Sequence, residues 1–589
     1  MPFLRPALPY LLLAVVTFAA YWNARPDTLV LDDKLFAGHE RFADLSRLPD
    51  FFGETVWAAA GANEALYRPL LMVSIAIDAA LFADRVAAYH LVNVLLHVLA
   101  TLLVYLLLLR LLRLAEPRDE SAELIALLAA LVFGVHPIHA EVVNSIFNRS
   151  TLLAAIGLAA GLWWLLRHFE ARPALAWTGI WLAYWFVLFS RETGIVLPAL
   201  AVALVWIYSS GGLRKKVLRC LPALPMAVPL LVYLAMRAHA VSPPLPSMPL
   251  GAGEPGDLLG VTDLVAPGRF LEFGYLLQVA GVWLDGLRLT LWPRPLLLVH
   301  PDLDEVMRIV GLFVHIGLVA AALILYRRKH YGLITGLAIF YIALLPASRL
   351  FGSVDSLNLA ERYLYEPSIG LAVLLAFGLR YLMRRGDRLV AAAPAVLAVF
   401  LLTPITWARN ADWSNEVALL EHDYRHGVRT QSSLRMLTSA YLLEHNAARA
   451  VEVCRENEDG PWGSGLMSVH CGTAYAMSGD AQEAEQAFLR AASSADSRTR
   501  AHSNLARLYM NQGRQDAARA QFEMAIESEV NPAIRAYRQG LMLVQLYPKD
   551  RGKLLEARAH FEEALRLQPR LTLAINALEQ VDRSLDQLP

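Results

Sequence analysis

The stretch YHLVNVLLHVLATLLVYLLLL, residues 89–109, contains no Asp, Glu, Lys or Arg. An α-helix needs about 20 mostly apolar residues to cross the hydrocarbon core of a bilayer, and this run has that length. Apolar runs of similar character recur until about residue 408 and then cease. The pattern predicts an all-α fold in two parts: a polytopic membrane helix bundle at residues 1–410 and a soluble domain at residues 411–589.

The composition agrees with a membrane protein. Of the 589 residues, 56% are hydrophobic and only 18% are charged, and the mean hydropathy is +0.41. An ordinary soluble domain needs less apolar material to fill its core. Lys plus Arg and Asp plus Glu both number 53, so the net charge gives no electrostatic basis for binding nucleic acid.

We predict eleven spans in the first part. They lie near residues 8–24, 89–109, 122–139, 151–168, 174–189, 194–209, 220–238, 306–326, 331–347, 366–383 and 389–407. The first run has a single Arg5 before it, and no small-x-small cleavage site follows TFAAYWN. We therefore expect an uncleaved anchor rather than a signal peptide.

Basic clusters indicate the orientation of the bundle, because cytoplasmic loops carry an excess of Lys and Arg. All the clusters fall on one side if the N-terminus is cytoplasmic. They are Arg110 with Arg113 and Arg118, Arg167 with Arg172, LRKKVLR at 213–219, RRKH at 327–330 and RRGDR at 384–388. The same count places Asp32, Asp33, HPIHAE at 136–141, SRE at 190–192, the loop 240–305 and LAERYLYEPS at 359–368 on the outer face.

The segment 271–293 is also long enough to cross. If it crossed, the clusters at 327–330 and 384–388 would lie outside. We therefore predict an amphipathic or re-entrant piece of an external loop, with Asp285 and Arg288 facing the interface.

The soluble domain contains an internal repeat. Gly472, Tyr475, Gly479, Ala484, Phe488 and Ala491 recur 34 residues later as Ala506, Tyr509, Gly513, Ala518, Phe522 and Ala525. This is the period of the tetratricopeptide repeat. Weaker copies lie upstream and downstream, which gives four repeats in an α-solenoid. The concave face of such a solenoid normally binds protein.

Three cysteines are too few for a disulfide framework. Cys220 is expected to start a membrane helix as filler, whereas Cys454 and Cys471 lie on neighbouring helices of adjacent repeats. Outside the reducing compartment these two can form a disulfide. The alternative is that they are two small buried residues filling a helix interface.

Several motifs occur together in one order. They are VLDDKLF, DFFGE, YRPLLMVS, YHLVNVLLH, FGVHPIHAEVVNSIFNRSTLLA, RETGIVLP, AERYLYEPSIG and RNADWSNEVALL. This order resembles the transmembrane and tetratricopeptide repeat (TMTC) O-mannosyltransferases and their bacterial relatives, over nearly the whole chain. Two features depart from the family: RETG stands where Lys-Glu is expected, and four repeats are fewer than many animal members have.

The resemblance implies a GT-C glycosyltransferase that uses a polyprenyl-phosphate sugar. Direct displacement would invert the anomeric centre. The expected reaction moves a hexose, mannose in this family, onto Ser or Thr of an exported protein at the outer face of a bacterial inner membrane. The alternatives are a membrane-anchored repeat scaffold for periplasmic assembly, and a transferase acting on a glycan or lipid.

Chemistry gives Asp32 and Asp33 a role that does not depend on the family name. Glycosyl transfer to a hydroxyl needs a base for the acceptor proton and positive charge for the departing phosphate. Asp32 aligns with the first acid of the Asp-Glu pair in related transferases and is the expected base, while Asp33 orients it or holds a cation. The plain alternative is a pair of acids that solvate a helix exit.

The remaining candidates would surround the donor. Arg149, Arg191 and Arg362 are candidate phosphate clamps, because a guanidinium fork matches phosphate oxygens. Each of these arginines is equally suited to a structural ion pair, Arg191 with Glu192 or Arg362 with Glu361. Tyr67, Arg68 and Tyr365 are candidates for lining the sugar pocket. His136, His139 and Glu141 have the close spacing of a phosphate cluster or of a site for Mg²⁺ or Mn²⁺, although the histidines would also serve as helix caps after Pro137.

Overall fold

The computed structural model describes residues 7–24, 28–57, 66–241, 273–348, 359–457, 460, 465–569 and 571–588. Its contacts divide the described chain into two units. The first unit ends at His426 and the repeat unit begins at Gly427. Helix α16 (Glu416–Arg425) therefore belongs to the first unit, where Leu419 packs with Val30 and Trp413 in a small buried cluster.

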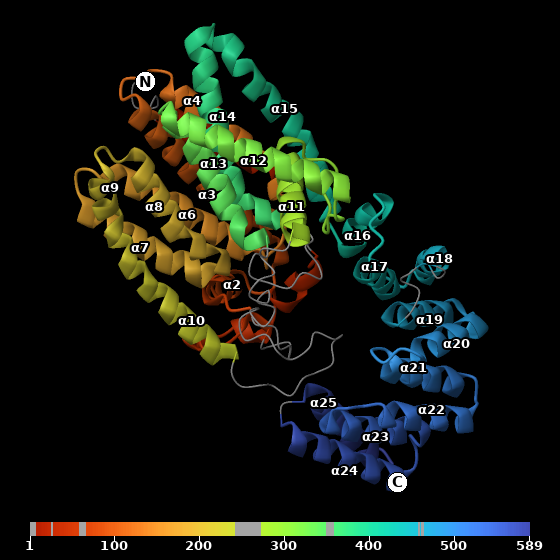
Figure 1. The fold of residues 1–589 in the computed structure, drawn as a ribbon. Coiled ribbons are helices and arrows are strands. Elements are labelled where there is room, and N and C mark those ends of the chain that lie inside the picture. The colour runs from red at the N-terminus through yellow and green to blue at the C-terminus, as the bar shows by residue number, and fades with distance from the viewer. Residues whose placement is uncertain are drawn as a thin grey trace. The chain divides into compact units, whose positions relative to one another are not determined.

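Seven segments of the first unit are helical, long and apolar enough to cross a membrane. They are α3 (Val86–Ala115), α6 (Arg149–His168), α7 (Pro173–Ser190), α9 to α10 (Leu213–Val241), α12 (Glu305–Arg327), η12 with α14 (Glu361–Arg385) and α15 (Arg388–Asp412). An eighth candidate is the pair α4 (Ala122–Gly134) and η6 with α5 (Pro137–Asn144), which is bent by 49°. The predicted helical membrane bundle is confirmed (Figure 1).

Four shorter apolar helices complete the bundle. They are α1 (Leu8–Ala20), α2 (Pro69–Phe82), η7 with α8 (Glu192–Tyr208) and α13 (Tyr331–Leu344). All eleven predicted spans fall on these segments, and seven of them lie on a single helix. The span at 122–139 lies across the bend after Gly134, and the spans at 194–209, 220–238 and 331–347 each continue from one helix into the next. Helix α2 was not predicted.

Helix α11 (Phe273–Leu291) covers the segment that was predicted not to cross. It is outside the set of candidate spans. The prediction that Asp285 faces the interface is wrong, because its side chain is buried. Asp285 accepts a hydrogen bond of 2.7 Å from Arg288 and lies 3.8 Å from His300, so this carboxylate points into the protein.

The core of the first unit lies among α3, α4, α6 and α14, where leucine and alanine side chains are fully buried. Polar caps help to define helix starts at the edges of the bundle. Asp304 accepts a hydrogen bond from the backbone N–H of Met307 at the start of α12, and Asp387 caps α15 in the same way. Such caps satisfy backbone donors that a helix leaves unpaired at its N-terminus.

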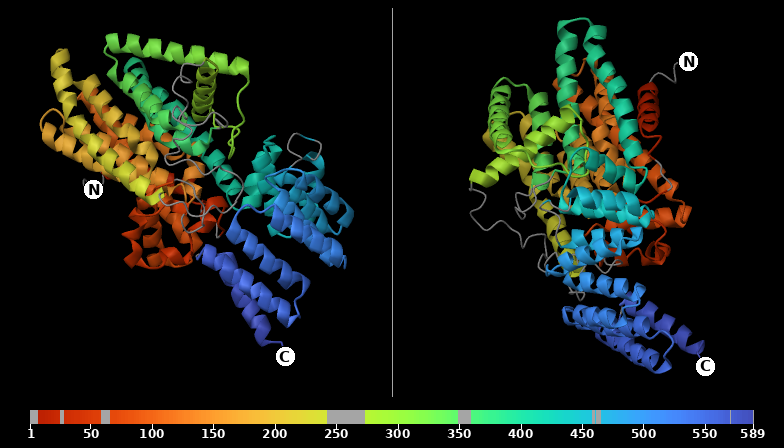
Figure 2. Two further views of the ribbon diagram at one scale, coloured as in Figure 1. Left: turned by 60° about the horizontal axis from the view of Figure 1, so that its bottom comes forward. Right: turned by 90° about the vertical axis from the view of Figure 1, so that its right-hand side faces the viewer.

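The repeat unit is an α-solenoid of helix pairs (Figures 1 and 2). Gly472 lies against the ring of Phe488, and Gly540 lies in the same way against Phe561. These contacts confirm that small residues let the paired helices approach. The helices are α17 (Gln431–Leu443), α18 (Ala447–Asn457), α19 (Leu466–Ser478), α20 (Ala481–Ala492), α21 (Arg498–Asn511), α22 (Gln515–Glu527), α23 (Pro532–Leu546), α24 (Arg551–Leu567) and the terminal α25 (Thr572–Asp586).

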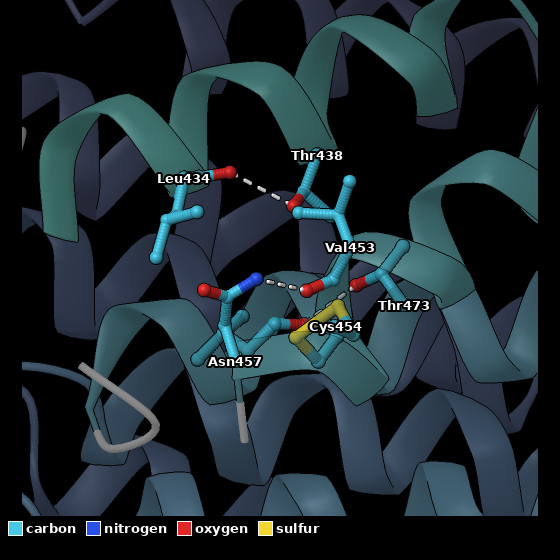
Figure 3. The surroundings of a disulfide bond; sticks show 8 residues. Leu434, Thr438, Val453, Cys454, Asn457 and Thr473 are labelled. Atoms are coloured by element: carbon cyan, nitrogen blue, oxygen red, sulfur yellow. Dashed lines mark hydrogen bonds between the residues drawn. A yellow bond between two sulfur atoms is a disulfide. The ribbon is translucent and has the colours of Figure 1, made fainter. Parts of the chain in front are cut away.

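A disulfide joins the first two repeats. Cys454 on α18 and Cys471 on α19 are bonded, with their Cα atoms 5.5 Å apart. Figure 3 shows the bond beside Thr438, which donates to the carbonyl of Leu434 one turn earlier. The predicted pairing is confirmed, whereas Cys220 is a free, half-buried thiol.

Candidate active site

Asp32 and Asp33 lie on the short 3-10 helix η1 (Leu31–Leu35), in the loop that follows α1. The turn begins at Leu31, whose φ of 54° is in the left-handed region. A residue other than glycine adopts this conformation only at a cost that the surroundings must offset. The two neighbouring carboxylates then take different positions: Asp33 is fully buried and Asp32 is exposed.

The buried carboxylate of Asp33 binds the loop before α6. It accepts hydrogen bonds from Ser145 Oγ at 3.1 Å, from the backbone N–H of Ile146 at 2.9 Å and from that of Phe147 at 2.8 Å. Burial raises its pKa to about 7, and the hydrogen bonds from Phe147, Ile146 and Ser145 oppose that rise. Asp33 therefore holds η1 in place and is not oriented to meet a ligand.

The charges of two arginines act on the carboxylate of Asp32. Desolvation by the surrounding protein raises the pKa of its carboxyl, even though part of the side chain is exposed, while Arg362 and Arg68 act in the opposite direction. Glu416 of α16 adds a smaller effect that raises the pKa. The result is an accessible carboxylate with a strengthened affinity for protons and with two permanent cations nearby.

Arg362 is held by Glu141, which is buried. Glu141 accepts hydrogen bonds from the Arg362 backbone N–H at 2.7 Å and from its Nη1 at 2.5 Å. The guanidinium also lies 5.0 Å from the centre of the Tyr363 ring. Because both oxygens of Glu141 are engaged, this carboxylate fixes the orientation of the arginine, which also makes a hydrogen bond with the side chain of Tyr363.

A second cationic group lies at the start of α2 and of η7. Arg68 donates to both oxygens of Glu192, at 2.9 Å and 2.5 Å. Arg68 Nη1 and Arg191 Nη1 both approach Ser150 Oγ, at 3.5 Å and 3.4 Å. The two guanidiniums are therefore close neighbours, and the Glu192 carboxylate is bound to Arg68.

The Glu192 carboxylate does not fully satisfy the buried charge of Arg191. Its side chain is buried, and it donates to the hydroxyl of Thr151. Among the described residues it makes no ion pair within 4.0 Å, and its buried Nε has no hydrogen-bond partner. A buried guanidinium with an unsatisfied N–H is costly unless an acceptor completes it.

Arg149 is engaged elsewhere. It is fully buried and forms an ion pair of 2.6 Å with Asp78. Its other N–H groups donate to Asn93 Oδ1 and to the carbonyl oxygens of Tyr89 and Ser74. The structure therefore uses Arg149 to join α2, α3 and α6, and a role as a phosphate clamp would require breaking these contacts.

The predicted cluster of His136, His139 and Glu141 does not converge on one point. His136 Nδ1 accepts from the backbone N–H of Ile138, and its Nε2 bonds the carbonyl of Thr290 at 3.1 Å. His139 Nε2 bonds Ser368 Oγ at 2.9 Å. In the part of the chain that the structure describes, no group of three or more His, Cys, Asp or Glu side chains is arranged to hold a metal ion.

Tyr365 and Tyr67 also have interior partners. The Tyr365 hydroxyl lies 2.7 Å from His97 Nδ1 in a buried aromatic group. Tyr67 donates to the carbonyl of Phe52 at 2.7 Å. Both hydroxyls are therefore engaged within the first unit, and a place in the sugar pocket stays a prediction.

A large apolar cavity of about 1010 Å³ lies within the first unit. Its walls come from α4 and α11 to α15, and polar side chains, among them His136, His139, Thr290 and Ser368, form part of its lining. The chain from His139 through Glu141 connects this polar region to Arg362. The cavity and the Asp32 loop are thus linked by one short segment.

Two members of the site were not predicted from the sequence. Glu192 pairs with Arg68 across 124 residues, and Ser150 lies between Arg68 and Arg191. Both are within quoted motifs, RETGIVLP and FNRSTLLA, so the motifs marked their neighbourhood. Nothing local in the sequence indicates which arginine each would meet.

Comparison with known proteins adds independent information. The chain is 25% identical over 552 residues to the mouse protein O-mannosyl-transferase TMTC3, covering 87% of this chain and 54% of that protein. It is 26% identical over 489 residues to the Drosophila melanogaster Tmtc3 protein, covering 70% and 51%. Its relatives are TMTC protein O-mannosyl-transferases.

The similarity extends to a second TMTC protein, TMTC1. Human TMTC1 is 26% identical over 424 residues, which cover 65% of this chain and 46% of that protein. The chain therefore spans about half the length of the curated TMTC relatives that it matches. A tetratricopeptide repeat family model matches residues 499–529, which comprise most of α21 and all of α22.

Proposed function

We propose that this chain is an inverting GT-C glycosyltransferase that moves a hexose, mannose by analogy with its TMTC relatives, from polyprenyl phosphate to Ser or Thr of exported proteins. The observation that carries the proposal is the accessible Asp32 carboxylate, whose negative charge Arg362 and Arg68 stabilise. The TMTC relatives are named protein O-mannosyl-transferases, which supports the same reaction class.

The proposed chemistry is a single displacement. The acceptor oxygen attacks the anomeric carbon and passes its proton to Asp32, while the bond from that carbon to the phosphate oxygen breaks and the electron pair leaves with polyprenyl phosphate. Arg362 and the unsatisfied N–H of Arg191 stabilise the growing negative charge. Their fixed partners, Glu141 and Thr151, keep them in position before the donor arrives.

A lipid-linked donor suits the apolar cavity. Its lining is mostly aliphatic and aromatic, so it favours a hydrocarbon chain over a nucleotide. The polar residues of the lining lead through Glu141 to Arg362, which would place the phosphate near Asp32. This arrangement supports polyprenyl phosphate as the carrier.

We further propose an integral protein of a bacterial inner membrane with a cytoplasmic N-terminus and an extracytoplasmic repeat unit. The distribution of basic clusters supports this orientation. The disulfide between Cys454 and Cys471 supports an oxidising compartment for the repeats. In this proposal residues 1–410 carry the chemistry, and residues 411–589 recruit the exported acceptor.

The test is transfer from a synthetic polyprenyl-phosphate mannose to an acceptor peptide by purified Asp32→Asn protein. The substitution keeps the shape and removes the base, so turnover should fall by about 10² to 10⁴. The matched control is Glu40→Gln, an exposed acid of the same loop, which should retain parent activity. Equal turnover by Asp32→Asn and the parent would reject the assignment and favour the scaffold alternative.

A further inference from the structure

The two helix layers of the repeat unit differ in charge. We call α17, α19, α21 and α23 the first-helix layer, and α18, α20, α22 and α24 the second-helix layer. Within these bounds the first-helix layer has no Asp or Glu. The second-helix layer carries Glu452, Glu456, Glu483, Glu485, Asp516, Glu523, Glu527, Glu556, Glu562 and Glu563.

Three arginines and one histidine of the first-helix layer share one face. Arg538 occupies the same place in its repeat as His470, two 34-residue periods earlier. In its own repeat, Arg435 lies one position before the residue equivalent to His470. Arg500 lies four positions before the equivalent residue of its repeat. Residues three or four apart on a helix share a face, so the four repeats present these groups on one side of the layer.

These side chains also interact across the repeats. Burial lowers the pKa of Arg500, and repulsion from Arg435 and Arg538 lowers it further. Burial lowers the pKa of His470 to about 4, again with contributions from Arg435 and Arg500. Half-buried cations on three different helices are therefore held close enough to repel one another.

Nearby acids compensate only part of this charge. Glu529 forms an ion pair of 3.0 Å with Arg538, which also donates to Ser503 Oγ at 2.9 Å. Asp496 acts favourably on Arg500. Among the described residues Arg435 makes no ion pair, so the face retains excess positive charge.

We propose that this face of the first-helix layer, at Arg435, Arg500 and Arg538, binds an acidic polypeptide segment. Carboxylates of Asp, Glu or a chain terminus match the guanidinium forks and would relieve their mutual repulsion. The helix acids lie in the second-helix layer, so this face has no helix acid of its own to repel an acidic partner. This separation of charge gives the face its selectivity.

The experiment measures binding of fluorescein-labelled decaglutamate to the detergent-solubilised full chain, with no sugar donor present. The parent should bind, and the affinity should fall as salt is raised, because the interaction is electrostatic. The double substitution Arg435→Gln with Arg500→Gln should weaken binding by about tenfold or more. Decaserine, which has the same length and no charge, should not bind.

The matched control is Arg519→Gln with Arg566→Gln. It makes the same change in net charge at exposed arginines of the second-helix layer and should alter the affinity by less than about twofold. Circular dichroism verifies folding. If the double variant is unfolded, Arg435→Gln alone, which breaks no ion pair with an acid, should still weaken binding by about threefold.

Equal losses in the two double variants would overturn the proposal, as would parent protein that fails to bind decaglutamate. Binding to phosphatidylglycerol vesicles that decaglutamate does not displace would assign the face to a membrane surface instead. Because no donor is present, these outcomes are independent of whether the first unit transfers sugar.

Discussion

The first unit and the repeat unit place charged side chains in opposite ways. In the first unit, Arg149 with Asp78 and Arg362 with Glu141 join distant segments, and three of these four side chains are almost fully buried. In the repeat unit, Gly472 against Phe488 and similar contacts hold the helix pairs together, and pairs such as Arg519 with Glu523 lie at the surface.

This difference separates two kinds of sensitivity. A buried charge that loses its partner remains in a medium that solvates it poorly, so a single isosteric change has a large effect. A surface pair contributes little, whereas tight packing of small residues fails when volume is added. Polar substitutions should therefore damage the first unit, and changes of volume or covalent links should damage the repeat unit.

The largest effect on stability is expected at the disulfide. The bond closes a separation of 17 residues between Cys454 and Cys471, and a loop of about that size contributes about 3 kcal/mol in the chain-entropy account. The change Cys454→Ser with Cys471→Ser should lower the unfolding free energy of the repeat unit by about that amount, measured by denaturant titration. Cys220→Ser is the control, and thiol titration that finds three free cysteines in the parent would contradict the prediction.

The next effect tests a charge pair of the first unit. Glu141→Gln keeps one acceptor for Arg362 but removes the charge and turns an N–H toward the arginine. A small displacement of a catalytic group costs about 10² in turnover, so transferase turnover should fall by about that factor while the fold survives. Glu54→Gln, which alters the ion pair with Arg41 in the same unit, should cost much less. A similar loss in both variants would mean that Glu141 acts only through stability.

The third effect is steric. A Cβ added at Gly472 would lie 2.5 Å from two ring atoms of Phe488, so Gly472→Ala should destabilise the repeat unit by about 1 to 3 kcal/mol. Gly552→Ala is the control, because its Cβ would meet only Asp550 Oδ1, at 3.3 Å. That change should be neutral or slightly stabilising, since alanine favours a helix by about 0.5 to 1 kcal/mol over glycine. Equal melting temperatures for the two variants would contradict the packing account.

The sequence predicted the helices far better than the roles of individual charges. Apolar run length and the repeat period are local, and both lead directly to the bundle and the solenoid. The roles of Asp32 and Asp33 differ because Ser145, Ile146 and Phe147 meet only the second acid, more than 100 residues along the chain. Arg149 in the same way depends on Asp78 and Tyr89, and no local pattern specifies such partners.

The smallest effect concerns a buried acid near the boundary between the units. Asp423 on α16 accepts two hydrogen bonds from the backbone N–H of Leu298, at 3.0 Å and 3.2 Å. Burial raises the pKa of Asp423 from 3.8 to about 6. The charges of Arg409 and His422 and the Leu298 N–H act against this rise, and the charge of Glu361 adds to it. A folded pKa above the unfolded value contributes stability that is complete below about pH 4 and is lost as the pH rises through 6.

From about pH 5 to about pH 6.5 this group should therefore lower the free energy of unfolding by about 1 kcal/mol. Asp423→Asn keeps an acceptor for Leu298 and cannot ionise, so the stability of the parent relative to the variant should fall across this range. Thermal melting of both proteins in the same detergent measures that difference and cancels the contributions of other groups that titrate there, Asp33 among them. A stability difference between parent and variant that stays constant with pH would show that Asp423 ionises equally in the folded and unfolded chains. A difference that grows with pH would show that Arg409 and the Leu298 N–H outweigh the cost of burial.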